Sequence, residues 1–272
     1  MHPDPQLLPA SLPARVRFLL TDVDGTLTSD GMLEAETYEA LHALSDAGIQ
    51  VVPVTGGCAG WADMMARTWP VAGVIAEGGA LYIRRLADGR VHYRFWDDRE
   101  RQRADQREVL AIVRRLLPEH PGLALAMDQD YRLCDVAIDH AQQVRDVPQA
   151  HIEAQIEAVL QRLGEAGLQA TRSSIHVNVW RGRHAKGAMA RRLLGDEFGL
   201  DGESVQARCI CLGDSPNDQD LFAHFELSVG VANIRPHWTR LRHRPRWVTN
   251  GAEGAGFREL ARCLLSAPGN AD

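Results

Sequence analysis

The sequence predicts an α/β fold: a Rossmann-like parallel sheet between two helical layers (a three-layer α/β/α core), with a smaller α+β domain inserted into it. Two observations indicate this fold. Short apolar runs alternate with segments of helical periodicity in the first and last thirds of the chain, as in parallel sheets covered by helices on both faces. Between them the order changes to α-β-β-α-β-β. The 272 residues suffice for a core and a smaller companion.

The first alternating part predicts three buried strands, because three short apolar runs are bounded by turn residues. These runs cover residues 15–21, 49–54 and 71–76. Apolar residues at helical spacing predict helices at 34–47 and 61–69. Helical crossovers of this kind are how parallel strands are joined.

The middle of the chain predicts the inserted domain. A hairpin at 81–96, which turns at Asp88-Gly89, leads into it. We place the insert at residues 86–183, so that residues 1–85 and 184–272 form the core. Its expected helices follow the charged stretch 97–108 as far as Pro118 and cover 151–163, and its expected strands are 123–127, 132–138, 168–172 and 174–180.

The alternation resumes after the insert. Helices are predicted from residue 184 to 198, from residue 217 onwards and at 256–266. Apolar runs predict strands between and after them, at residues 207–212, 226–231 and 247–249. These elements complete the same parallel sheet.

Composition and charge exclude several classes of function. The net charge of −6, from 30 basic and 36 acidic residues, argues against nucleic-acid binding. No apolar stretch is long enough to span a membrane, and the first 15 residues do not resemble a signal peptide. Five cysteines without metal-ligand spacing indicate reduced thiols. We therefore expect a cytoplasmic protein with no nucleic-acid or membrane partner.

The basic residues are strongly biased. Of the 30, 29 are arginine and one is lysine, Lys186. Lysine carries a compact ammonium on a thin stem, whereas arginine carries a wide planar fork. The single lysine is either an accident of composition or the mark of a site where a guanidinium does not fit.

Polar residues follow three of the predicted core strands. Asp22 and Asp24 follow the first strand, and Asp214 and Asp218 follow a late one. Because ligands bind beyond the carboxyl ends of parallel strands, we expect these carboxylates to lie close together. Four such groups repel one another unless a cation is present, and oxygen ligands suit Mg²⁺. A carboxylate-bound Mg²⁺ in turn predicts a phosphate-bearing substrate.

Two further segments fit a phosphate partner. Thr55-Gly56-Gly57 follows the second strand, where glycine-rich turns expose N–H groups to anions. Lys186 begins the first helix after the insert and can reach the same edge as a point charge.

The chain carries these residues in four ordered segments: Asp22-Val23-Asp24-Gly25-Thr26, Thr55-Gly56, Lys186 and Gly213-Asp214-Ser215-Pro216-Asn217-Asp218. They resemble the four motifs of the haloacid dehalogenase (HAD) superfamily. The insert lies between the second and third motifs and resembles the C2B cap of type IIB members. Such members include Cof-type, sucrose-phosphate and mannosyl-3-phosphoglycerate phosphatases. The resemblance covers the core, about residues 15–85 and 184–266.

The resemblance implies covalent catalysis. Asp22 would be the nucleophile that forms an aspartyl-phosphate, and Asp24 the general acid and base. Mg²⁺ would be bound by the carboxylate of Asp22, the main-chain carbonyl of Asp24 and the side chain of Asp214. Asp218 would act on the metal from a second shell or through water.

The same resemblance implies a phosphate cradle. Thr55, the Gly56 amide and Lys186 would hold the phosphoryl oxygens, and Asn217 would assist by ordering water and the loop. The chain departs from the Cof-type pattern at Gly57, where many members carry arginine, and at Gly78, where they often carry asparagine. Glycine at position 57 cannot make the phosphate or substrate contact that arginine makes in those members. We expect this contact either to be missing or to be supplied by the cap.

The predicted cap offers three candidate substrate contacts. His176 and Asn178 share one face of a strand with Ser174, while Ile175, Val177 and Val179 share the other. The polar face either looks down on the substrate or is the wet side of a half-exposed sheet. Arg132, on a neighbouring strand, either contacts an anionic or sugar group or serves the fold.

The function expected from these residues is a Mg²⁺-dependent phosphatase that hydrolyses a small phosphorylated metabolite, and the expected substrate class is a sugar phosphate. Two alternatives stay open. A phosphosugar mutase would use the same aspartyl-phosphate chemistry and return the phosphoryl group to the sugar. A non-catalytic binding or regulatory protein on the same fold would have lost the nucleophile, the acid or a metal ligand, and all of these are present.

Overall fold

A computed structural model describes residues 5–10, 12, 15–142 and 147–267. Its centre is a five-stranded sheet in which every neighbouring pair is parallel. The strand order is β12-β11-β10-β1-β2. In chain order the strands are β1 (Phe18–Thr21), β2 (Gln50–Pro53), β10 (Cys209–Gly213), β11 (Leu227–Gly230) and β12 (Trp247–Val248).

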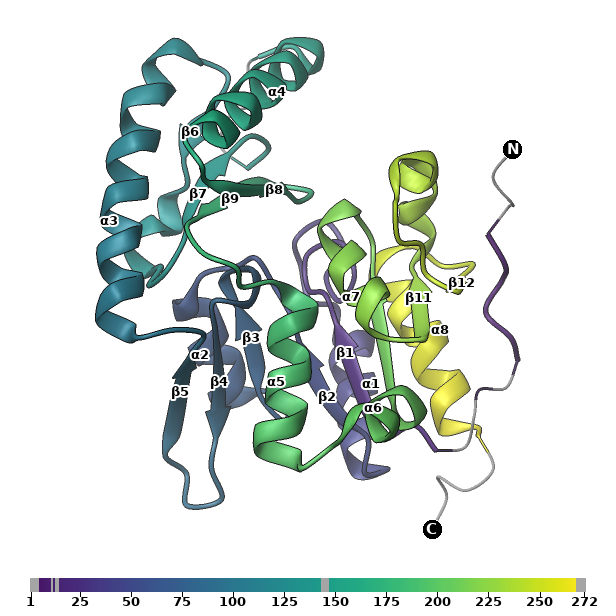
Figure 1. Cartoon of the computed structure of the whole chain (residues 1–272). Coiled ribbons are helices and arrows are strands. Elements are labelled where there is room, and N and C mark those ends of the chain that lie inside the picture. The colour runs from purple at the N-terminus through teal and green to yellow at the C-terminus, as the bar shows by residue number, and fades with distance from the viewer. Residues whose placement is uncertain (1–4, 11, 13–14, 143–146, 268–272) are drawn as a thin grey trace.

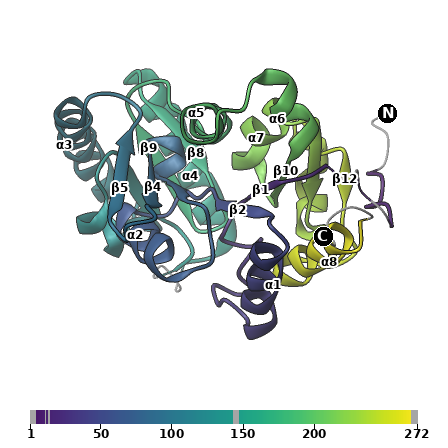
Figure 2. The same ribbon diagram turned by 90° about the horizontal axis from the view of Figure 1, so that it is seen from below.

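Helices cover both faces of this sheet (Figure 2). One side carries α5 (Lys186–Phe198), α6 (Gly202–Arg208) and α7 (Gln219–His224), and the other carries α1 (Ala35–Asp46) and α8 (Glu253–Leu265). Successive strand residues point to opposite faces, so Leu19 packs in one apolar cluster and Leu20 in the other. Burial on both faces explains why the strands read as continuous apolar runs.

A second sheet extends the core at the β2 edge. It consists of β3 (Val74–Ala76), β4 (Leu81–Arg85) and β5 (Val91–Phe95), all antiparallel, and follows α2 (Ala59–Thr68). An isolated parallel bridge between Val54 and Ile75 connects it to the chain leaving β2. The expected boundary at residue 86 falls inside the β4–β5 hairpin, and the division into domains stays a prediction.

The inserted module forms a separate antiparallel sheet with order β6-β7-β9-β8. Its elements are α3 (Arg99–Leu116), β6 (Ala124–Leu125), β7 (Val136–Asp139), α4 (Gln149–Glu165), β8 (Gln169–Arg172) and β9 (His176–Trp180). Val177 and Val179 pack with α3 and α4 in one apolar cluster. In Figure 1 the strands β8 and β9 lie between these helices and the core. The predicted fold class is thereby confirmed.

Several predicted strands are shorter in the structure, and for two of them the cause is clear. The strand expected at 132–138 begins only at Val136, because the N–H groups of Leu133, Cys134 and Asp135 donate to the carboxylate of Glu77 instead of to a neighbouring strand. The strand expected at 207–212 begins at Cys209, because α6 occupies the preceding residues. None of the described helices combines the length and apolarity needed to cross a membrane.

A tight 3₁₀ turn, Glu77–Gly79, sets where α5 begins. Gly79 has φ of +104°, and a Cβ on it would lie 2.3 Å from the carbonyl oxygen of Ala185. The glycine therefore permits the close backbone approach that places Lys186, the first residue of α5.

We predict that Gly79→Ala destabilises the protein by about 2–4 kcal/mol, because it adds backbone strain and a clash. Gly89→Ala is the matched control: its φ is +83°, but nothing lies within 4 Å of the added Cβ, so it should cost only about 1 kcal/mol. Urea unfolding measures both. Equal losses of stability would show that the approach to Ala185 does not matter.

Candidate active site and metal centre

The first strand delivers two aspartates to the carboxyl edge of the sheet. Asp22 directly follows β1; it is buried and its N–H donates to the carbonyl of Leu212 at 3.0 Å. The chain then turns tightly, because the N–H groups of Thr26, Leu27 and Thr28 all donate to the carbonyl of Val23. This turn leaves Asp24 half-buried at the edge of the pocket.

The single lysine joins two of the predicted motifs. Lys186 Nζ donates to Asp22 Oδ1 at 2.6 Å and to Asp218 Oδ1 at 2.7 Å, and all three side chains are buried. Burial disfavours the ammonium most strongly, but Asp218 and Asp22 outweigh it and raise the pKa of Lys186. The lysine therefore stays charged and holds the two carboxylates together.

The loop after β10 contributes the other two aspartates. Asp218 Oδ2 accepts the N–H groups of Asp214 and Ser215 at 3.0 and 3.2 Å, which closes the loop on itself. A Cβ on Gly213 would lie 2.5 Å from Asp218 Cγ, so glycine is required there. Both oxygens of Asp218 thus have donors inside the protein, which fits its expected place outside the first coordination shell.

Asp22, Asp214 and Asp218 can each bring one oxygen within 4.8 Å of the others. Residues from opposite ends of the chain are therefore close enough to share one ion, as the sequence predicts. Burial, followed by repulsion from Asp218, raises the pKa of Asp22 to about 7, although Lys186 opposes this. Burial, followed by repulsion from Asp22, also raises the pKa of Asp214 well above its usual range. Three carboxylates against one ammonium leave negative charge that Lys186 does not offset, and this charge, with oxygen as the donor type, fits a hard divalent cation such as Mg²⁺.

Asn233 is a site residue that the sequence analysis missed. Its Nδ2 donates to Asp214 Oδ2 and to the carbonyl of Gly25, both at 3.0 Å. It thus orients the metal-ligand candidate against the turn that carries Asp24. Asn233 lies just beyond β11, so the same strand-end argument would have found it if applied to that strand.

The predicted phosphate segment lies beside Asp24. Thr55 is buried, and its Oγ1 accepts the N–H of Gly57 at 2.8 Å. Gly56 and Gly57 line a small pocket with Asp22 and Asp24. Asn217 lines it too and accepts a hydrogen bond from Ser215 Oγ at 2.8 Å. The structure thus brings the four predicted segments together; the role of each residue stays a proposal.

The inserted module, here called the cap, forms one wall of the pocket. His176 and Asn178 line it together with Ser173 and Ile175. Ser174 is exposed and does not line it, because residues 173–175 turn before β9 begins and the strand alternation does not extend to them. Burial lowers the pKa of His176 to about 4, so its imidazole is neutral near pH 7. Its Nε2 has no hydrogen-bond partner among the described residues.

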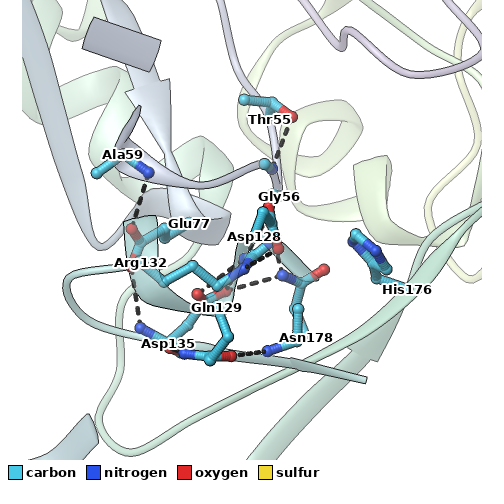
Figure 3. A network of polar contacts seen from close by, with 12 residues as sticks. Thr55, Gly56, Ala59, Glu77, Asp128, Gln129, Arg132, Asp135, His176 and Asn178 are labelled. Atoms are coloured by element: carbon cyan, nitrogen blue, oxygen red, sulfur yellow. Dashed lines mark hydrogen bonds and ion pairs between the residues drawn. The ribbon is translucent and has the colours of Figure 1, made fainter. Parts of the chain in front are cut away.

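Arg132 is placed differently from the other cap candidates. Its side chain is fully buried and does not line the pocket. The guanidinium forms ion pairs with Asp128 and Asp135, both at 2.9 Å, and donates to the carbonyl of Gly56 (Figure 3). Its contacts in this structure are therefore with the protein, while a contact with substrate stays a prediction.

Glu77 is a second residue that the sequence analysis missed. This fully buried carboxylate accepts N–H groups from Ala59 in the core and from residues 133–135 in the cap. Its φ of +49° is unusual for a residue with a side chain, and these bonds hold it there. No local sequence pattern reveals this role, because three of its partners lie more than 50 residues away.

Comparison with solved structures identifies the fold. The chain is similar to the C-terminal domain of the C. albicans trehalose-6-phosphate phosphatase, at 17% identity and a TM-score of 0.69, over 97% of this chain and 99% of that one. It is also similar to the sucrose-phosphatase of Synechocystis sp. PCC6803, solved with sucrose and phosphate. The identity is 17% and the TM-score 0.62, over 90% of this chain and 96% of that one. A Bacteroides thetaiotaomicron phosphatase of the haloalkanoate superfamily matches at 20% identity and a TM-score of 0.60, over 93% of this chain and 96% of that one.

These likenesses confirm the predicted resemblance at the level of the fold: the chain has the architecture of HAD phosphatases, a parallel core with a separate antiparallel cap. No protein-family model and no curated protein sequence matches it.

We predict that Asn233→Ala weakens Mg²⁺ binding about tenfold, because the partners of a metal ligand fix its orientation. Titration calorimetry measures the affinity. Asn250→Ala is the control, since Asn250 is exposed and its side chain donates to Glu259, away from the acidic cluster. An unchanged affinity in Asn233→Ala would contradict the role assigned to this residue.

Proposed function

We propose that this protein is a Mg²⁺-dependent phosphatase that hydrolyses a small phosphorylated metabolite through an aspartyl-phosphate on Asp22. The observation that carries the proposal is the position of Asp22. Its carboxylate is held by Lys186 on one oxygen, is within reach of a metal shared with Asp214, and borders the same pocket as Asp24. Phosphoryl transfer requires this combination of positioning and charge neutralisation.

The first half-reaction uses both aspartates of the first motif. Asp22 attacks phosphorus, and the bond from phosphorus to the leaving oxygen breaks as Asp24 donates a proton to that oxygen. Burial raises the pKa of Asp24, which favours the protonated form that this step needs. The products are the free alcohol and phosphorylated Asp22.

The second half-reaction regenerates the enzyme. Asp24, now ionised, accepts a proton from a water molecule that attacks phosphorus, and the bond to Asp22 breaks to release inorganic phosphate. Lys186 and the Thr55–Gly57 segment would hold the phosphoryl oxygens. Mg²⁺, bound by Asp22, Asp214 and the carbonyl of Asp24, would neutralise charge on the phosphoryl group and the carboxylates.

We propose a sugar phosphate as the substrate class. The pocket is small, and its cap side offers His176 and Asn178, which can hydrogen-bond hydroxyl groups. The sucrose-phosphatase and trehalose-6-phosphate phosphatase with the same fold act on molecules of this kind by their names, which supports the proposal. Free thiols on all five cysteines are in keeping with the cytoplasmic location that we also propose.

We predict that the protein with Mg²⁺ releases inorganic phosphate from one or more members of a sugar-phosphate panel, and that Asp22→Asn abolishes this release with an unchanged circular dichroism spectrum. Asp30→Asn, which alters an exposed carboxylate near the same loop, should keep full activity. A metal-loaded protein inert to every phosphate ester would refute the proposal. Isomerised sugar phosphate without free phosphate would favour the mutase.

We predict that Mg²⁺ affinity is higher at pH 8 than at pH 6 by about tenfold, because Asp22, with a pKa near 7, must lose its proton to bind the ion. Affinity rises with pH because burial and repulsion from Asp218 favour the protonated carboxyl of Asp22 in the folded, metal-free protein. Calorimetry in two buffers of different ionisation enthalpy measures the affinity and the protons released. Affinity that falls with pH would contradict the assignment.

A further inference from the structure

The carbonyl oxygen of Gly56, in the proposed phosphate loop, is held by the cap. Arg132 Nη1 and Asn178 Nδ2 both donate to it, each at 2.9 Å (Figure 3). Asn178 lies on β9 and Arg132 lies just before β7, so both donors come from the inserted module and the acceptor comes from the core. A Cβ on Gly56 would lie 2.9 Å from Asn178 Oδ1, so glycine allows this approach.

Both donors are fixed by a shared anchor. Asp135 accepts Arg132 Nη1 on each of its oxygens, at 2.9 and 3.1 Å, and Asn178 Nδ2 at 2.8 Å. Asp128 holds the other side of the guanidinium through Nε and Nη2, at 3.1 and 2.9 Å. A buried arginine with its donors this fully used has little freedom to move.

The anchor is itself fastened to the core. Glu77 Oε2 accepts the N–H of Asp135 at 3.0 Å, and Glu77 Oε1 accepts the N–H of Ala59, at the start of α2, at 2.9 Å. The segment from Gly56 to Ala59 is therefore hydrogen-bonded at both ends to a network that includes residues of the cap.

Holding the Gly56 carbonyl orients the rest of the loop. The carbonyl of Gly56 and the N–H of Gly57 belong to one planar peptide and point in opposite directions. That N–H donates to Thr55 Oγ1 at 2.8 Å. The hydroxyl of Thr55 must then direct its own proton away from this peptide, so the orientation of the Gly56–Gly57 peptide also sets the direction of the Thr55 hydroxyl.

We propose that Arg132 and Asn178 are positioning residues, whose bonds to the Gly56 carbonyl shape the Thr55–Gly57 loop for phosphate, so that the loop is competent only when the cap is seated. This rests on the proposed function for its phosphate ligand. The seating itself is a property of the free protein and is measurable without any substrate.

The test uses Arg132→Lys, which keeps a positive charge near Asp128 and Asp135 but lacks the planar fork that reaches Gly56 as well. Binding of inorganic phosphate to the Mg²⁺-loaded protein should weaken about tenfold, as expected for one charge-assisted hydrogen bond. Mg²⁺ affinity without phosphate should not change. Hydrogen exchange at the Gly57 amide should accelerate.

Arg172→Lys is the matched control. Arg172 lies on β8 of the same module and pairs with Glu153, with no hydrogen bond to the loop. The same substitution there should leave phosphate affinity and Gly57 exchange unchanged. An Arg132→Lys protein that behaves like this control in both measurements would overturn the inference.

Asn178→Ala provides a second, independent variant should Arg132→Lys fold poorly. It should weaken phosphate binding and accelerate Gly57 exchange in the same way. The double variant should lose less affinity than the product of the two single losses, because both side chains act on one carbonyl. If the affinity loss of the double variant equals the product of the two single losses, the two side chains do not act through the same carbonyl. If wild-type protein binds no phosphate, the proposed function fails, and Gly57 exchange alone decides the inference.

Discussion

The site depends on one buried ammonium between two carboxylates. Without Lys186, Asp22 and Asp218 would repel each other in a region shielded from water, where charge interactions are strong. The lysine joins the first strand to the loop after β10, two segments that are far apart in the chain but adjacent in the sheet. In a protein with 29 arginines, this is the position where a compact cation is required.

A second buried acidic residue, Glu77, fixes the position of the cap on the core. Glu77 accepts backbone N–H groups from both the core and the cap, and the positive φ of this residue is the local strain that the arrangement imposes. The guanidinium of Arg132 neutralises part of the surrounding negative charge and reaches the Gly56 carbonyl. The cap is thus attached to the core next to the loop on which phosphate would bind.

Sequence reasoning identified the fold class and predicted which residues would meet at one edge of the sheet, because strand ends in a parallel sheet converge whatever the details of packing. It therefore placed Asp22, Asp24, Thr55 and Asp214 at one edge without any coordinates. It missed Glu77 because that residue acts through the backbone of a distant segment, which residue types do not encode. It likewise could not tell that Arg132 turns toward protein acceptors, because the strand expected to carry this residue begins only at Val136.

The most direct test of the central claim is to find the phosphoryl group on the enzyme. Asp24→Asn removes the base that activates water, and an activated ester such as p-nitrophenyl phosphate needs no acid to release its alcohol. Acid-quenched Asp24→Asn protein with Mg²⁺ and this ester should carry a phosphoryl group on the peptide containing Asp22, as detected by mass spectrometry. A phosphoryl group on another residue, or none in a sample that releases the alcohol, would contradict the account.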